Sequence, residues 1–282
     1  MPEVSVLDST VHYEEGGAGD PIVLLHGNPT SSLLWRKVIP PLASEGRCLA
    51  PDLIGMGRSG KPDIGYRFAD HARYLDAWFD ELGLEGVTLV GHDWGGALGF
   101  HWAARHRERV AATAFMETIV KPISWAEFPE AAREIFQSLR TPGTGEQLIF
   151  EQNLFVEVIL PASMQHQLSP EEMEAYRAPF LDPKHRLPTL AWPRELPIDG
   201  EPADVVAAVE AYDEWLAAST DVPKLLLTFE PGAIMSAPVV GWCREHIAAL
   251  EVVGAGEGIH FVPEDQPEAI ARLVSDWRRR VL

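Results

Sequence analysis

Residues 87–96 read VTLVGHDWGG, and they are the most informative stretch of the chain for its fold. A short apolar run followed by a glycine, a polar residue and two more glycines predicts a strand that turns sharply into a helix. A side chain at Gly91 or Gly95 would collide with neighbouring backbone in so tight a turn. The turn presents Asp93 at its tip, where turns of this kind usually carry serine.

An aspartate at this tip favours attack on a saturated carbon. The carboxylate would displace a leaving group and form an ester, and water could then attack the carbonyl carbon of that ester. Serine attacking the same carbon would give an ether, which water does not readily cleave. The turn therefore points to the opening of a carbon–halogen bond or an epoxide. A carboxylate is also favoured at a helix start without any catalytic role, so Asp93 needs partners elsewhere in the chain.

The rest of the chain alternates short apolar runs with longer amphipathic stretches, which predicts a mostly parallel central sheet flanked by helices. The expected strands are 22–25, 47–51, 87–90, 110–116, 224–229 and 250–253, after an antiparallel pair near 4–7 and 11–14. The expected helices are 69–82, 95–105, 239–249 and 267–281. The pattern breaks between residues 118 and 201, which are rich in proline and aromatic residues. We expect a helical cap there, inserted between the core segments 1–117 and 202–282.

Composition excludes several classes of protein. A net charge of −19, from 42 acidic against 23 basic residues, disfavours nucleic acid and anionic membranes as partners. No signal peptide or membrane-spanning stretch is evident, and the two cysteines show no CxxC spacing, so a cytoplasmic protein is expected. No His/Cys cluster has metal-ligand spacing, and no cofactor is expected.

Residues 55–60 match G-x-G-x-x-G, but Pro62 follows, which favours a loop over a nucleotide-binding helix start.

Two neutral donors are candidates for holding a leaving anion. Asn28 follows the expected strand 22–25 in His26-Gly27-Asn28-Pro29, and Trp94 follows Asp93. In hydrolases built around such a turn, the backbone N–H groups at these two places form the oxyanion hole. The Asn28 amide and the Trp94 indole add side-chain N–H groups that suit a halide. Without a ligand role, Asn28 would make a turn before Pro29 and Trp94 would be core packing.

A general base and an acid complete the candidate site. His260 lies in a glycine-rich loop after the last expected strand, the usual place for the base that activates water. A carboxylate must then hold its other ring nitrogen. Glu117 ends the strand 110–116 and Glu230 follows the strand 224–229, and the spacing alone does not choose between them.

With these residues in view, the chain resembles the haloalkane dehalogenases of the α/β-hydrolase superfamily, and within them the subfamily of the hexachlorocyclohexane-degrading enzyme. The resemblance runs from residue 22 to the last helix. It rests on HGNPTSS at 26–32, DLIGMG at 52–57, GHDWGG at 91–96, NLFVE at 153–157, PTLAWPR at 188–194 and HFVPED at 260–265.

The resemblance implies hydrolysis of haloalkanes to alcohol, halide and proton through an ester on the nucleophile Asp93. It assigns His260 as the base, Glu117 rather than Glu230 as the acid, and Asn28 and Trp94 as the halide clamp. It also places an apolar pocket under the cap, while Ser163 stands where an apolar pocket residue is usual. The expected pocket residues are Phe128, Phe136, Phe155, Trp192, Leu196, Ala233 and Ile234. The expected partners are a small halogenated substrate and halide, with the protein a monomer or weak homo-oligomer.

Three other functions fit parts of the pattern. An epoxide hydrolase shares the aspartate but needs cap tyrosines, and Tyr176 is the only tyrosine between residues 118 and 201. A coelenterazine-type luciferase shares the same residue set and is disfavoured only by general likeness. A signalling receptor on this fold would bind without turnover, and it would keep serine where this chain has Asp93.

Overall fold

The core of the molecule is one eight-stranded sheet. The computed structural model describes residues 2–282. The strands of the sheet lie in the order β1-β2-β4-β3-β5-β6-β7-β8. The pairs β1–β2 and β2–β4 are antiparallel, and every later pair in this order is parallel. The strands are β1 (Glu3–Val6), β2 (Ser9–Gly16), β3 (Pro21–Leu25), β4 (Arg47–Pro51), β5 (Val87–Asp93), β6 (Val110–Thr118), β7 (Lys224–Pro231) and β8 (Leu250–Gly258). The mostly parallel sheet expected from the alternating pattern is confirmed.

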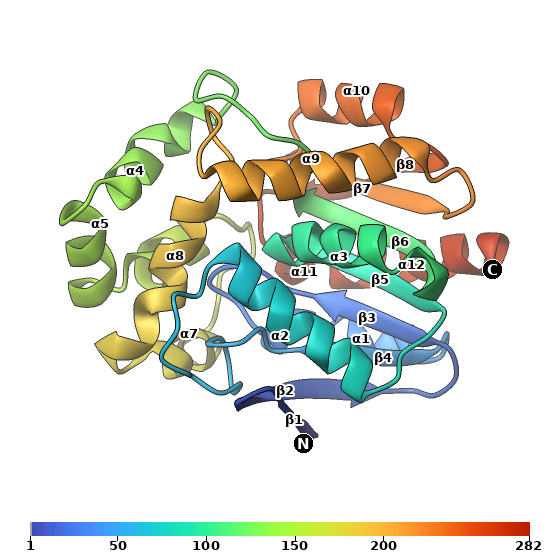
Figure 1. Cartoon of the computed structure of the whole chain (residues 1–282), viewed down its shortest axis with the longest axis horizontal. Coiled ribbons are helices and arrows are strands. Elements are labelled where there is room, and N and C mark those ends of the chain that lie inside the picture. The colour runs from blue at the N-terminus through green and yellow to red at the C-terminus, as the bar shows by residue number, and fades with distance from the viewer. Residues whose placement is uncertain (1) are drawn as a thin grey trace.

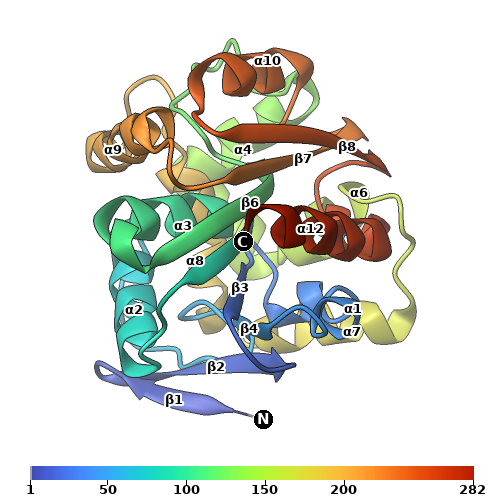
Figure 2. The ribbon, with the colours of Figure 1, turned by 90° about the vertical axis from the view of Figure 1, so that its right-hand side faces the viewer.

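Helices cover both faces of this sheet. One face carries α2 (Phe68–Glu81), α3 (Trp94–Arg105) and α9 (Ala203–Ala218), and the other carries α1 (Ile39–Leu42) and α12 (Pro267–Val281), as Figure 2 shows. The inner strands β3 and β5 are buried from end to end or nearly so, which explains why they read as continuous apolar runs. Further core elements are η1 (Ser32–Trp35), η2 (Arg107–Arg109), α10 (Ala237–His246) and α11 (Val262–Asp265).

A group of helices inserted between β6 and α9 forms the cap. It lies beyond the carboxyl ends of the parallel strands (Figure 1). Its elements are α4 (Glu130–Arg140), α5 (Thr144–Glu146), η3 (Gln147–Glu151), η4 (Phe155–Ile159), α6 (Leu160–Ala162), α7 (Pro170–Arg177), η5 (Ala178–Phe180), η6 (Pro183–Arg186) and α8 (Leu187–Glu195). The carboxyl ends of parallel strands are where ligands bind in sheets of this type, so the cap roofs the place where a site is expected.

Tight packing explains the glycines around Asp93. A Cβ atom on Gly91 would lie 2.4 Å from the Gly96 Cα, and one on Gly95 would lie 2.2 Å from the Leu25 carbonyl oxygen. Asp93 itself has a φ of 52°, an unfavourable conformation for a residue with a side chain. The predicted sharp turn from β5 into α3 is therefore confirmed, and it projects the Asp93 side chain beneath the cap.

The structure differs from the sequence-based expectations at several element ends, and it contains the core helix α9 in addition to the helices expected. β8 continues to Gly258, although its second half contains the glycines that suggested a loop. This half pairs with Phe229, Glu230 and Pro231 of β7 after a bulge, so the neighbouring strand overrides the low strand preference of glycine. Residues 55–60 form turns and α2 begins only at Phe68, as expected for a loop. No helix in residues 2–282 is long and apolar enough to span a membrane.

Candidate active site

Asp93 is held by backbone donors on one side and left open on the other. Its Oδ2 accepts a hydrogen bond of 2.8 Å from the Asn28 backbone N–H, and the Trp94 N–H also favours its charged form. Its main-chain carbonyl accepts a 2.5 Å bond from the Thr118 hydroxyl of β6. The other carboxylate oxygen, Oδ1, lies 3.8 Å from Nε2 of His260. The two oxygens of Asp93 therefore have different surroundings: Oδ2 is bound by the Asn28 N–H, and Oδ1 lies toward the histidine.

His260 stands between two carboxylates. Its Nε2 faces Asp93, and its Nδ1 lies 3.5 Å from Oε2 of Glu117, a longer separation than a usual hydrogen bond. Burial disfavours the charged ring, but the Glu117 and Asp93 carboxylates beside it together raise the pKa of His260 above its ordinary value of 6.5. Burial raises the pKa of Asp93, against the effects of His260 and the Asn28 and Trp94 N–H groups. The arrangement matches a nucleophile, a base and an acid in line.

Glu117 is fixed by a turn that follows β7. Its Oε2 accepts hydrogen bonds of 2.9 and 2.8 Å from the backbone N–H groups of Ala233 and Ile234, and its Oε1 accepts one of 3.2 Å from Met235. A Cβ atom on Gly232, which has a φ of +66°, would lie 3.0 Å from Glu117 Oε1. Backbone donors of this kind stabilise an ionised carboxylate. Ala233 and Ile234 therefore support the acid, in addition to any contact with substrate.

Glu230 lies outside this arrangement. Its side chain is exposed, and within residues 2–282 it makes no ion pair or hydrogen bond with His260. The structure therefore brings together Asp93, His260 and Glu117, and of the two carboxylates that the sequence left open it brings only Glu117 to the histidine.

Asn28 and Trp94, whose backbone N–H groups act on Asp93, also carry side-chain N–H donors. Both residues are almost fully buried, and within residues 2–282 neither the Asn28 amide nor the Trp94 indole N–H donates to another group. The Trp94 ring stacks on Trp192 at a centroid distance of 4.6 Å, and Trp192 in turn stacks on His71 at 4.1 Å. This stack orients the indole, and burial lowers the pKa of His71 to about 3, so the histidine in the stack is neutral.

Three of the expected pocket residues pack on one another between β6 and α9. Phe128 packs on Phe136 at a centroid distance of 5.1 Å, and Phe136 packs edge to face on Phe155 at 6.0 Å. Leu196 is buried in the same core as Phe128, whereas Trp192 is fully buried within the stack between Trp94 and His71. The cap thus contributes a cluster of apolar side chains, the kind of lining that suits a small apolar molecule.

Two features of the site carry no sequence signal of their own. His92 Nε2–H donates a 2.7 Å hydrogen bond to the main-chain carbonyl of His260, and burial lowers the pKa of His92, which keeps it neutral. The Tyr176 hydroxyl donates to the buried carboxylate of Glu264. Because the only tyrosine between residues 118 and 201 is committed in this way, the site lacks the free cap tyrosines that epoxide opening needs.

Comparison with known proteins is consistent across sequence and structure. Residues 20–168 match the family model described as the alpha/beta hydrolase fold. The chain is 50% identical to a haloalkane dehalogenase of Mesorhizobium japonicum, with 99% of this chain and 91% of the relative covered. It is 48% identical to one of Sphingobium indicum, with 95% and 92% covered.

Solved structures that superimpose on this chain belong to the same family of enzymes. A putative ancestral haloalkane dehalogenase superimposes with a TM-score of 0.97 at 51% identity, covering 100% of this chain and 99% of that one. The haloalkane dehalogenase of Bradyrhizobium elkani superimposes with a TM-score of 0.96 at 50% identity, covering 99% and 97%.

Proposed function

Because the chain belongs to the haloalkane dehalogenases of the α/β-hydrolase fold, we propose that Asp93, His260 and Glu117 are its catalytic residues and that Asn28 and Trp94 bind the departing halide. The overall reaction is the hydrolysis of a haloalkane to alcohol, halide and a proton. The observation that carries the assignment is the asymmetry of Asp93, with Oδ2 bound by the Asn28 N–H and Oδ1 open toward His260.

In the first half-reaction Asp93 acts as a nucleophile. Oδ1 attacks the carbon that bears the halogen, a C–O bond forms, and the halide departs with the electron pair of the broken bond. The Asn28 amide and the Trp94 indole donate to the halide as its charge develops. Both donors are neutral, which suits a large and weakly basic anion, and the stack on Trp192 holds the indole in place. His260 transfers no proton in this step.

In the second half-reaction His260 acts as a general base. It takes a proton from water, the hydroxide adds to the ester carbon of Asp93, and negative charge develops on Oδ2, where the Asn28 and Trp94 N–H groups stabilise it. Glu117 stabilises the charged imidazole. The intermediate then expels the alcohol with Oδ1, which takes the proton back from His260. The Asp93 carboxylic acid that remains loses its proton to solvent.

The cap residues define the substrate class. We propose that Phe128, Phe136, Phe155 and Leu196 contact the alkyl part of the substrate, and that Trp192 acts through Trp94, because it is fully buried. Ala233 and Ile234 border the same site through the turn that holds Glu117. The boundaries 118 and 201 of the cap remain a prediction of the sequence.

Halide release from a panel of chlorinated, brominated and iodinated alkanes tests this function. We expect halide and alcohol in equal amounts. In a single turnover in ¹⁸O-labelled water, the alcohol should carry unlabelled oxygen and Asp93 should gain the label, because water attacks the ester carbon rather than the alkyl carbon. Label in the alcohol of the first turnover would exclude attack of water on the carbonyl carbon of an ester at Asp93.

A matched pair of variants tests which glutamate is the acid. Glu117→Gln should slow ester hydrolysis by about 10²- to 10⁴-fold, because an amide neither stabilises the imidazolium nor accepts all three backbone hydrogen bonds. Glu230→Gln should leave the rate within about twofold, as for a typical surface change. Single-turnover alcohol formation measures both, and equal losses in the two variants would contradict the assignment of Glu117.

The pH dependence should differ between the free enzyme and the ester. Only neutral His260 accepts a proton, so hydrolysis should slow as pH falls through its pKa. In the free enzyme the Asp93 and Glu117 charges raise that pKa above 6.5. Esterification removes the Asp93 charge, so the pKa of His260 in the intermediate should be lower. NMR titration of His260 in the free enzyme should therefore give a higher midpoint than the single-turnover hydrolysis rate, and the reverse order would contradict this mechanism.

A further inference from the structure

The main chain of His260 is attached to the cap. The backbone N–H groups of His260 and Phe261 both donate to the carbonyl oxygen of Ser163, at 2.9 and 3.1 Å. Ser163 directly follows α6 of the cap. On the other side, the His260 carbonyl accepts the bond from His92 at the end of β5. The core therefore holds only one side of this residue, and the cap holds the other.

Asp265 forms a second set of hydrogen bonds between the core and the cap. This residue ends α11, five positions after His260, and its Oδ1 accepts hydrogen bonds of 2.9 and 2.8 Å from the backbone N–H groups of Gln165 and His166. Each segment therefore donates hydrogen bonds to the other: 260–265 donates to the Ser163 carbonyl, and 163–166 donates to the Asp265 carboxylate. Bonds to an ionised carboxylate are stronger than neutral ones, so Asp265 contributes much of the hold on this cap segment.

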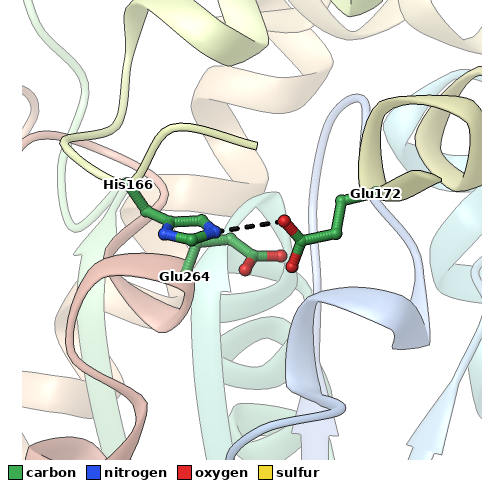
Figure 3. A group of neighbouring side chains, drawn as sticks. All are labelled: His166, Glu172 and Glu264. Carbon is green, nitrogen blue, oxygen red and sulfur yellow. Dashed lines mark hydrogen bonds and ion pairs between the residues drawn. The ribbon is translucent and has the colours of Figure 1, made fainter. Parts of the chain in front are cut away.

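An ionic cluster joins the same two parts of the molecule further out. Nε2 of His166 lies 3.2 Å from Oε2 of Glu172 of α7. Glu264 of α11 lies beside these two residues (Figure 3). Arg36 bonds to both carboxylates, and Lys37 lies 3.1 Å from Glu172 and 3.2 Å from Glu264. Two basic side chains already balance the two acidic ones, so we read the cluster as a structural contact rather than a cation site. The ion pairs of Arg36 and Lys37 with Glu172 attach α7 to the core without using the Asp265 carboxylate.

We propose that Asp265 is a positioning residue for the second half-reaction, acting through the cap segment 163–166 on the main chain of His260. This inference rests on the proposed role of His260 as the base. Activation of water requires Nε2 of His260 within hydrogen-bond reach of a water that itself faces the ester carbon, and a displacement of about 1 Å can cost on the order of 10²-fold in rate. Ester formation needs no proton transfer by His260. Loss of Asp265 should therefore slow ester hydrolysis and leave ester formation unchanged.

The test compares both half-reactions in Asp265→Ala, Asp265→Asn and the unmodified enzyme. Rapid-quench measurement of halide and alcohol gives the rates of ester formation and ester hydrolysis separately. We expect Asp265→Ala to slow hydrolysis by about tenfold or more, with ester formation within about twofold. Intact mass should show the alkyl-enzyme during turnover. Asp265→Asn keeps an acceptor oxygen for both N–H groups and should restore most of the hydrolysis rate.

Asp182→Ala is the matched control within the cap. Asp182 also accepts a backbone bond, from Lys184, but it is exposed and makes no hydrogen bond or ion pair with segment 260–265 among residues 2–282. It should leave both steps unchanged. Unchanged hydrolysis in Asp265→Ala, or equal slowing of both steps, would overturn the positioning role. Normal turnover by His260→Phe would instead show that the proposed function is at fault, so the two failures are distinguishable.

Discussion

Replacing His260 with phenylalanine is expected to stop the enzyme after one equivalent of halide has been released. Ester formation needs Asp93 and the halide donors but no base, so it should proceed. Hydrolysis loses its general base and should slow by about 10²- to 10⁴-fold. Intact-protein mass spectrometry should then show an increase equal to the alkyl group less one hydrogen. Phenylalanine keeps the ring that packs against Phe261 and His92, so the variant should fold.

The double variant Asp93→Ala with His260→Phe provides the control. It should show neither the halide burst nor the mass increase, because the group that forms the ester is gone. Steady turnover by His260→Phe at the unmodified rate would refute the assignment of the base. A mass increase that persists in the double variant would place the alkyl group on another residue.

Replacing Asp93 with alanine should reduce halide release to background, a loss on the order of 10⁴-fold or more for a residue that forms the covalent intermediate. No other carboxylate among residues 2–282 makes the contact that Asp93 Oδ2 makes with the Asn28 N–H. Burial raises the pKa of Asp93, so its ionised form destabilises the folded protein at neutral pH relative to the unfolded chain. Losing this charge should offset much of the loss of the hydrogen bonds.

Halide assays across the alkane panel and a thermal melt check this prediction together. Loss of activity with a melting temperature close to that of the unmodified enzyme indicates a chemical role for Asp93. Halide release by Asp93→Ala at more than trace rates would contradict its role as nucleophile. Loss of activity together with loss of folding would contradict the expected balance between burial of the charge and its hydrogen bonds.

The fold was predictable because its signals are local. The inner parallel strands β3 and β5 are buried on both faces and read as apolar runs, and Gly91 is required by the close approach of Gly96 within the turn. Strand ends were less predictable. The glycines of β8 suggested a loop after residue 253, but pairing with β7 extends the strand to Gly258. Pairing partners lie far away in sequence, so no local pattern reports them.

Some residues of the candidate site were likewise predictable from the sequence, and others were not. Asp93 and Trp94 follow from one stretch, and Asn28 and His260 from their places after strands. The choice between Glu117 and Glu230 did not follow from spacing, and only the resemblance indicated Glu117. In the structure it is accompanied by backbone N–H groups of residues 233–235, and the His260 main chain is held by the Ser163 carbonyl. Every residue except proline has a backbone N–H, and every residue has a carbonyl, so such partners leave no mark in a sequence.

The bond from His260 to Ser163 has a consequence for protein engineering. Caps of related enzymes are attractive units to exchange when a new substrate range is wanted, since they supply the pocket wall. In this protein the exchanged piece would also bring its own carbonyl for the His260 and Phe261 N–H groups and its own partners for Asp265. The exchanged cap would therefore change the rate of ester hydrolysis in the chimera as well as its substrate preference.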